Sequence, residues 1–126
     1  MVMKKIIILI LFSIFSTQSY AVEKKTNFTV EIFEQAKAEG KTIVINSYEK
    51  WCGTCSTQTK ILTEAEKKFS DIVFLSYEQS KNKNIATLLN VKFWTTIIVF
   101  KGNKEKARII GQTNKDEIFK AILKGV

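Results

Sequence analysis

The stretch Trp51-Cys52-Gly53-Thr54-Cys55 decides the fold. It follows the β-branched run Ile43–Ile45 and precedes an amphipathic segment that extends to Phe69. This order of strand, turn, cysteines and helix places Cys52 at a helix start, where unpaired N–H groups and the helix dipole lower a thiol pKa. Cys55 lies almost one turn further on, on the same side, and can attack the Cys52 sulfur. The spacing predicts disulfide exchange with Cys52 as the nucleophile and Cys55 as the resolving thiol.

The composition narrows the alternatives for this cysteine pair. A structural disulfide between residues three apart closes a very short loop and removes little entropy from the unfolded chain, so it would stabilise the fold only slightly. A zinc site normally needs four ligands, and the sequence has 2 cysteines and 0 histidines. The missing histidine also argues against hydrolases with a histidine base. We therefore expect redox exchange, with no metal and no cofactor in a single chain.

The hydrophobic pattern predicts alternating helices and strands after a polar tail over residues 22–28. Helices are expected from the N-cap Thr29 to Gly40, over about Cys55–Phe69, around Ile85–Leu89, and after a capping box formed by Asn114 and Glu117. Strands are expected at Thr42–Ser47, Ile72–Leu75, Thr96–Phe100 and Ala107–Ile110, the last two joined by a turn at Lys101–Lys104. The order α-β-α-β-α-β-β-α predicts an α/β fold, in which helices cover both faces of a central mixed sheet.

The N-terminus has the layout of a secretory signal. Lys4 and Lys5 precede the apolar run Ile6–Phe12, and the small residues Ser19 and Ala21 suit a cleavage site. We predict a signal peptide over residues 1–21, a mature domain over residues 22–126, and a periplasmic location. A retained anchor is the alternative, although the apolar run is short for a bilayer of about 30 Å.

The net charge of +8 does not indicate a nucleic-acid-binding protein. The lysines are scattered through helical and loop segments, and no basic block is interleaved with aromatic residues. We expect a solvated basic surface and no nucleic-acid partner.

The motif, taken with the segment Leu88–Phe100 and with Gly111 before the last helix, resembles the thioredoxin-like family over about residues 29–124. Among relatives it looks nearest to small exported thiol-disulfide interchange proteins and to the C-terminal domain of thiol-disulfide interchange protein D. The resemblance implies a thioredoxin fold and dithiol exchange with protein clients, more in the direction of reduction. Because the exterior holds no strong pool of small reductant, a partner must recharge the pair, and we expect a membrane thiol carrier as electron donor. We also expect a monomer.

Three positions depart from the family pattern. Thr95 stands where the family has a cis-proline beside the first cysteine, and because a cis bond before a non-proline residue costs about 2.5 to 4 kcal/mol, we predict a trans Trp94–Thr95 bond. Asn46 stands where the family has a buried aspartate that deprotonates the resolving thiol. We expect slower deprotonation of Cys55, with Glu49 or water as substitutes. Lys60 replaces a proline that kinks the long helix, so a straighter helix is expected.

The tryptophans beside the motif have two readings. Trp51 and Trp94 are either ordinary core residues or an apolar rim that shields the thiolate and grips an extended peptide, Trp51 being the better candidate for the rim. Tyr48 and Phe93 are expected in the core. The dipeptide Gly53-Thr54 influences the reduction potential but does not give its value, so the redox direction does not follow from it.

Two other functions compete with exchange. In the first, the fold is a peptide-binding or chaperone-like module with vestigial cysteines, for which the missing proline is the best argument. In the second, two chains meet as a dimer and hold a metal ion between their cysteine pairs.

Overall fold

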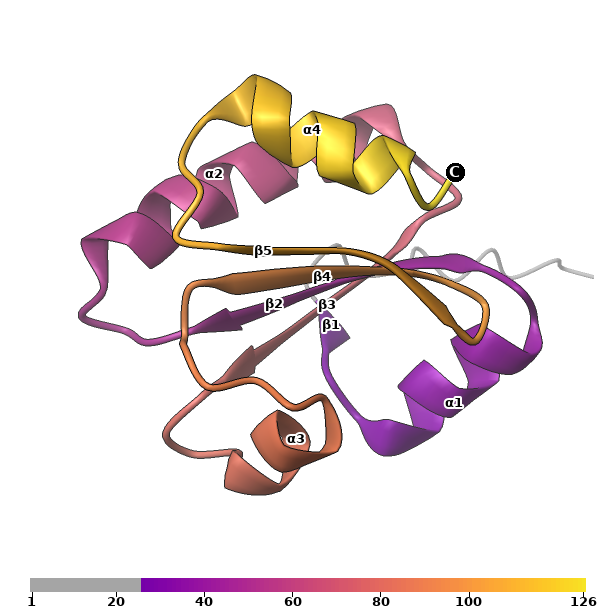
Figure 1. Cartoon of the computed structure of the whole chain (residues 1–126), viewed down its shortest axis with the longest axis horizontal. Coiled ribbons are helices and arrows are strands. Elements are labelled where there is room, and N and C mark those ends of the chain that lie inside the picture. Colours follow the sequence, from indigo (N-terminus) through magenta and orange to yellow (C-terminus); the bar gives the residue numbers. More distant parts are fainter. Residues whose placement is uncertain (1–25) are drawn as a thin grey trace, which may run out of the picture.

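The computed structural model describes residues 26–126 and contains four helices and five strands in that part of the chain (Figure 1). The strands are β1 (Thr26–Asn27), β2 (Thr42–Tyr48), β3 (Val73–Glu78), β4 (Thr96–Lys101) and β5 (Lys104–Ile110). The helices are α1 (Val30–Ala38), α2 (Gly53–Lys68), α3 (Lys83–Leu88) and α4 (Lys115–Leu123). No helix within residues 26–126 is long and apolar enough to cross a membrane.

The five strands form one mixed sheet in the order β1-β3-β2-β4-β5. β1, β3 and β2 run parallel, whereas β4 is antiparallel to β2 and β5 is antiparallel to β4. Figure 1 shows α2 and α4 on one face of this sheet and α1 and α3 on the other. The predicted α/β architecture is therefore confirmed.

The short strand β1 corrects the predicted polar tail. Thr26 and Asn27 pair in parallel with Leu75 and Ser76, and the backbone N–H of Phe28 donates to the Ser76 carbonyl at 2.8 Å. The Phe28 side chain is buried in the core. A strand of two residues is too short to show the alternation by which strands are recognised, so the sequence pattern did not reveal it. Residues 22–25, the rest of that tail, lie outside the described part.

The sheet separates two apolar cores. Alternate residues of β2 point to opposite faces, so Ile43 and Ile45 join one core while Val44 joins the other. The first core packs α1 and α3 against the sheet, and its buried members include Phe33, Ala36, Ile85 and Leu89. The second core packs α2 and α4 against the sheet, and its buried members include Ile61, Leu62, Ala65, Ile118 and Ile122.

The helix ends follow the sequence signals with small shifts. The hydroxyl of Thr29 accepts the Ile32 N–H at 3.2 Å, which confirms Thr29 as the N-cap of α1. Gly40 ends this segment with φ of +67°, a conformation that glycine adopts without strain. Only half of the expected capping box at α4 forms: Asn114 accepts the Glu117 N–H at 3.0 Å, whereas the Asn114 N–H donates to the side chain of Gln112.

The hairpin of β4 and β5 lies where the sequence predicts it, but its second strand is longer than predicted. β5 begins at Lys104, three residues before the expected start at Ala107, and a bulge beside Val99 and Phe100 shifts the register between β4 and β5. The turn at Lys101–Lys104 is where the sequence indicates it, and Gly102 there has φ of +54°.

Candidate active site

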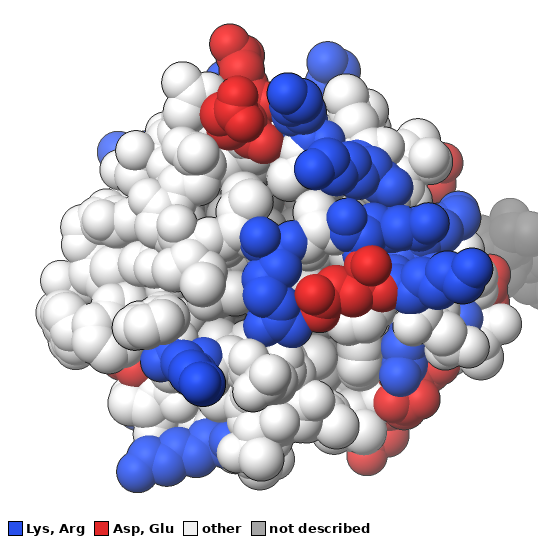
Figure 2. Space-filling view, viewed as in Figure 1, with Lys and Arg blue, Asp and Glu red and all other residues white. Residues whose placement is uncertain are grey.

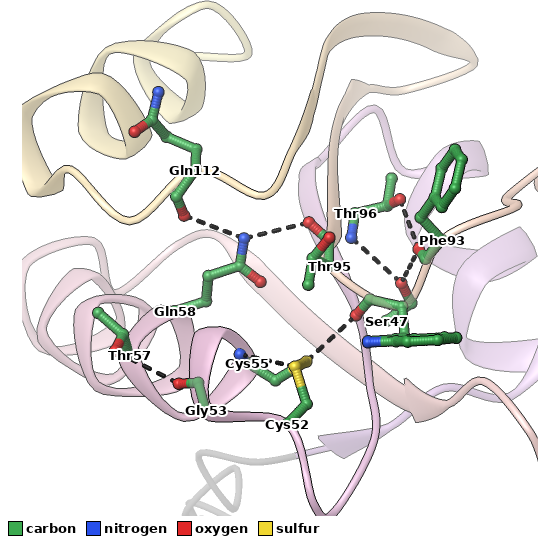
Figure 3. The surroundings of a disulfide bond; sticks show 11 residues. Ser47, Cys52, Gly53, Cys55, Thr57, Gln58, Phe93, Thr95, Thr96 and Gln112 are labelled. Carbon is green, nitrogen blue, oxygen red and sulfur yellow. Dashed lines mark hydrogen bonds between the residues drawn. A yellow bond between two sulfur atoms is a disulfide. The ribbon is translucent and has the colours of Figure 1, made fainter.

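Cys52 and Cys55 form a disulfide at the amino-terminal end of α2, with their Cα atoms 5.2 Å apart (Figure 3). Cys52 is the N-cap of the helix, and its Sγ accepts the backbone N–H of Cys55 at 3.1 Å. Its own N–H donates to the Glu49 carbonyl at 3.3 Å, which closes the turn between β2 and α2. One of the unpaired N–H groups at the helix start is thus directed at sulfur, and the same contact would stabilise a thiolate.

The two sulfurs differ in access to solvent. Cys52 is partly exposed, whereas Cys55 is 2% exposed and packs under the loop before β4. The first turn of α2 contains no acidic residue, so no carboxylate of that turn opposes negative charge on Cys52. An accessible sulfur with a second sulfur behind it is the arrangement that disulfide exchange requires, and the nucleophilic and resolving roles of the two cysteines stay a prediction.

The loop before β4 lies against the disulfide. The carbonyl oxygen of Trp94 is 3.4 Å from the Sγ of Cys55 and would accept a hydrogen bond from the Cys55 thiol in the reduced pair. The Trp94–Thr95 peptide bond is trans, as expected for a residue that is not proline. The Ser47 hydroxyl at the end of β2 donates to the Phe93 carbonyl at 3.0 Å and accepts the Thr96 N–H at 3.3 Å. The loop therefore keeps its place beside Cys55 without a proline.

The two tryptophans form an apolar rim beside the sulfurs. Trp51 is 72% exposed and Trp94 38% exposed, and their rings meet edge to face with centroids 5.1 Å apart. The reading of these residues as core is therefore wrong. Phe93, which is predicted to be in the core, is 56% exposed on the same loop, while its backbone carbonyl accepts a hydrogen bond from Ser47. Tyr48 is half-buried rather than fully enclosed.

Asn46 is buried at 5% exposure in β2, and its Nδ2 has no hydrogen-bond partner among the described residues. It lines a cavity of about 310 Å³ between α2 and the sheet, together with Thr59 and Thr63. An amide cannot accept the proton of Cys55. The cavity has room for water, but Cys55 is not among the residues that line it, so water as the proton acceptor of Cys55 stays a prediction.

The side chain of Glu49 is engaged elsewhere. Its carboxylate is buried and accepts the Ser80 N–H at 2.6 Å and the Ser80 hydroxyl at 3.0 Å. These bonds tie the turn that carries Cys52 to the loop between β3 and α3. We therefore assign Glu49 to holding this turn rather than to accepting a proton from Cys55.

Most of the remaining positions around the motif are open to solvent. Gly53 is exposed as the first residue of α2, and a side chain there would meet nothing within 4 Å. Thr54 is half-buried, and Lys50 and Lys60 are exposed. α2 runs without interruption from Gly53 to Lys68, past the position where the family has its kinking proline.

Sequence reasoning missed two residues of the site, Ser47 and Gln58. Gln58 is fully buried, and its Nε2 donates to the carbonyls of Thr95 at 3.1 Å and Gln112 at 3.0 Å. The signal for Gln58 was present, since a polar residue three positions after Cys55 lies on the apolar stripe of α2. Ser47 gave no such signal, because a serine at a strand end is common. Within residues 26–126, no group of three histidine, cysteine or acidic side chains is placed to hold a metal ion.

Comparison with known proteins agrees with this geometry. The family model for thioredoxin matches residues 19–124. A thioredoxin H-type from Fagopyrum esculentum is 34% identical over 92 residues, 73% of this chain and 78% of that protein. The crystal structure of Trxlp from Edwardsiella tarda has a TM-score of 0.74 at 22% identity and covers 78% of this chain and 97% of the other, which shows the shared fold.

An oxidised mitochondrial thioredoxin 3 from Saccharomyces cerevisiae has a TM-score of 0.69 at 25% identity over 78% of this chain and 92% of its own. These relatives are named as thioredoxins, so they support the general family and not the narrower resemblance to interchange protein D. The family match, the fold and the disulfide at the start of α2 agree. The chain therefore belongs to the thioredoxin family of thiol-disulfide oxidoreductases.

Proposed function

We propose that this protein is an exported thiol-disulfide oxidoreductase that reduces disulfides in client proteins through Cys52. The observation that carries the proposal is the placement of a partly exposed Cys52 sulfur at the start of α2, beside two exposed tryptophans, with Cys55 buried behind it. This arrangement provides a reachable sulfur, a stabilising local field and a second thiol within reach.

The reaction begins from the reduced pair. The Cys52 thiolate attacks one sulfur of a client disulfide, a mixed disulfide forms, and the other client sulfur leaves as a thiolate that takes up a proton. Cys55 then loses its proton and attacks the Cys52 sulfur. The Cys52–Cys55 disulfide forms and the second client sulfur leaves as a thiol after protonation. The client gains two electrons and two protons, and the pair is oxidised by the same two electrons.

The surface around the sulfurs suits an extended polypeptide. The rim of Trp51 and Trp94 offers flat apolar rings beside Cys52, and Phe93 adds a third exposed ring on the same loop. Figure 2 shows few charged side chains at the left end of the molecule, where the turn between β2 and α2 lies, whereas lysine and arginine gather toward the opposite side. Clients would therefore bind through apolar contact and backbone hydrogen bonds near the sulfurs.

Export and the electron donor rest on the sequence. The predicted signal peptide, residues 1–21, lies outside the described residues. If the domain acts in the periplasm, the oxidised pair must be recharged there, and we propose a membrane thiol carrier as the donor. We also propose that the protein acts as a monomer.

Insulin reduction by dithiothreitol tests the exchange function. We compare the parent protein with Cys52→Ser and with the matched control Ser56→Ala, which changes an exposed residue beside the pair and keeps both sulfurs. Parent and Ser56→Ala should accelerate precipitation of the insulin chains to similar extents, and Cys52→Ser should match the rate without protein. Equal rates for the parent and Cys52→Ser would contradict the proposal and favour the peptide-binding module.

Mass spectrometry of the protein recovered from a bacterial periplasm tests export. We expect a chain that begins at Val22, and recovery of the full-length chain from the cytoplasm alone would contradict export. The dimeric metal carrier makes a different claim about the same sulfurs. Metal analysis after purification under reducing conditions would support it only if the metal content approaches one ion per two chains.

A further inference from the structure

We propose that Gln58 is a positioning residue that holds the Trp94–Thr95 segment against the disulfide and thereby sets how tightly a client binds. This inference rests on the proposed function, because it assumes that clients dock on the rim that contains Trp94. Gln58 does not touch the reacting atoms in the described contacts. It acts through the loop before β4.

The contacts of Gln58 join three parts of the molecule. Its Nε2 donates at 3.1 Å to the carbonyl of Thr95, before β4, and at 3.0 Å to the carbonyl of Gln112, between β5 and α4 (Figure 3). The side chain is fully buried, so water does not compete for these bonds. A single amide on α2 therefore fixes two loops that are distant in sequence.

The loop needs this support because its backbone is not restrained by proline. Proline fixes its own φ near −65°, whereas Thr95 leaves that angle free. The Thr95 carbonyl is held by the Gly111 N–H at 3.0 Å in addition to Gln58, and Ser47 holds Phe93 at 3.0 Å on the other side. The Trp94–Thr95 peptide unit is thus oriented by hydrogen bonds, and its Trp94 carbonyl is the one that lies 3.4 Å from the Cys55 sulfur.

The position of Gln58 on α2 links this support to the sulfurs. Gln58 is three residues after Cys55, so it lies on the same side of the helix. α2 thus carries both sulfurs and, through Gln58, one of the hydrogen bonds that hold the Trp94–Thr95 segment beside them.

The free-energy cost of burying the Gln58 side chain also indicates a role for its N–H groups. The Oε1 of Gln58 has no hydrogen-bond partner among residues 26–126, and a buried polar atom without a partner is destabilising. An apolar side chain of similar size on this stripe would avoid that cost but would leave the Thr95 and Gln112 carbonyls with one donor fewer. The side chain is explained by what its N–H groups hold.

The variant Gln58→Met tests the inference, since methionine has a similar length and no donor. The matched control is Gln79→Met, which also removes an amide: Gln79 donates to the Val91 carbonyl at 3.1 Å and has an unpartnered Oε1. In steady-state insulin reduction Gln58→Met removes both hydrogen bonds and releases the loop, and if the client thereby loses about one hydrogen bond to the misplaced segment, KM should rise about fivefold to tenfold with kcat within about twofold. Gln79→Met should leave both within about twofold. An unchanged KM for Gln58→Met, or an equal rise in both variants, would overturn the inference.

Failure of this inference and failure of the proposed function give different results. A parent protein without insulin-reducing activity would overturn the function, whereas an active parent with unaltered KM in Gln58→Met would overturn only the inference. If Gln58→Met does not fold, Gln58→Asn takes its place, because asparagine keeps the amide but is one methylene shorter. A raised KM with kcat within about twofold supports the inference, and an unchanged KM would overturn it.

Discussion

Helices α2 and α4 pack on the same face of the sheet and begin in opposite ways. α4 starts at Asn114, whose side chain accepts the Glu117 N–H at 3.0 Å, and its first turn carries the carboxylates of Asp116 and Glu117. α2 starts at Cys52, whose sulfur accepts a backbone N–H, and its first turn has no acidic residue. The positive end of α4 is neutralised by its own side chains, which stabilises the helix. At the positive end of α2 the acceptor is the Cys52 sulfur, so the helix dipole and the N–H groups there stabilise a thiolate.

The largest expected effect comes from removing the second sulfur of α2. In Cys55→Ser the Cys52 thiolate still attacks a client, but the intramolecular step that releases the client is lost, and turnover should fall on the order of a hundredfold or more. Non-reducing electrophoresis should then show a mixed disulfide between protein and client. The control Ser56→Ala keeps both sulfurs and should show none. Full turnover in Cys55→Ser would contradict the role given to the buried sulfur.

The opposite face of the sheet contributes a pH effect that must be separated from thiol titration. Burial raises the pKa of Tyr77 to about 12, with the Ser47 hydroxyl and Arg108 acting in the other direction. In the unfolded chain the Tyr77 phenol loses its proton near pH 10. Between about pH 10 and 12 the unfolded state therefore binds fewer protons than the folded state, and the free energy of unfolding falls as pH rises. The loss approaches about 2 to 3 kcal/mol above pH 12.

Urea unfolding of the parent and of Tyr77→Phe across this range checks the effect. The phenylalanine variant should lose less stability between pH 10 and 12 than the parent does. Parallel pH profiles for the two proteins would show that Tyr77 is not responsible.

Removing the cap of α4 should lower stability and spare the chemistry. Asn114→Ala eliminates the side-chain acceptor for the Glu117 N–H, and the free energy of unfolding should decrease by about 1 kcal/mol. Asn114→Asp keeps an acceptor and serves as the control in urea unfolding. The alkylation rate of Cys52 should be the same in both variants. A slower alkylation in Asn114→Ala would show that the start of α4 influences the Cys52 thiol, and would contradict the separate roles given to the two helix ends.

The smallest effect should follow from giving α2 the charge pattern of α4. Thr54→Glu places a carboxylate in the first turn beside Cys52, which competes with the thiolate for the helix end and should raise the thiol pKa by about half a unit. The uncharged control Thr54→Gln should leave the pKa unaltered. The pH dependence of alkylation measures both. An equal shift in the two variants would show that size rather than charge is responsible.

The sequence predicted what depends on local patterns. The helix stripe ending at Phe69, the strand Ile43–Ile45 and the cysteines between them gave the fold and the start of the active helix. The apolar pattern of the helix is strong because its apolar side chains all pack against one face of the sheet. The cap at Thr29 was recognised for the same reason, since its chemistry is contained in four consecutive residues.

The features that escaped prediction depend on contacts between distant segments. Gln58 meets the carbonyls of Thr95 and Gln112, 37 and 54 residues away, and no local pattern announces such partners. Phe93 resembles a core residue by type, but it lies on the loop before β4, whose course is set by contacts with distant segments such as Ser47, and its ring is exposed. The strand β1 is likewise defined by its partner β3 rather than by its own two residues.

The pKa of the Cys52 thiol in the reduced protein tests the central claim most directly. It can be measured from the rate of iodoacetamide alkylation as a function of pH. The same measurement on the Cys55→Ser variant confirms which sulfur reacts. If the start of α2 stabilises the thiolate, the pKa should lie below about 7.5. A value at or above about 8.5, that of an ordinary cysteine, would contradict it.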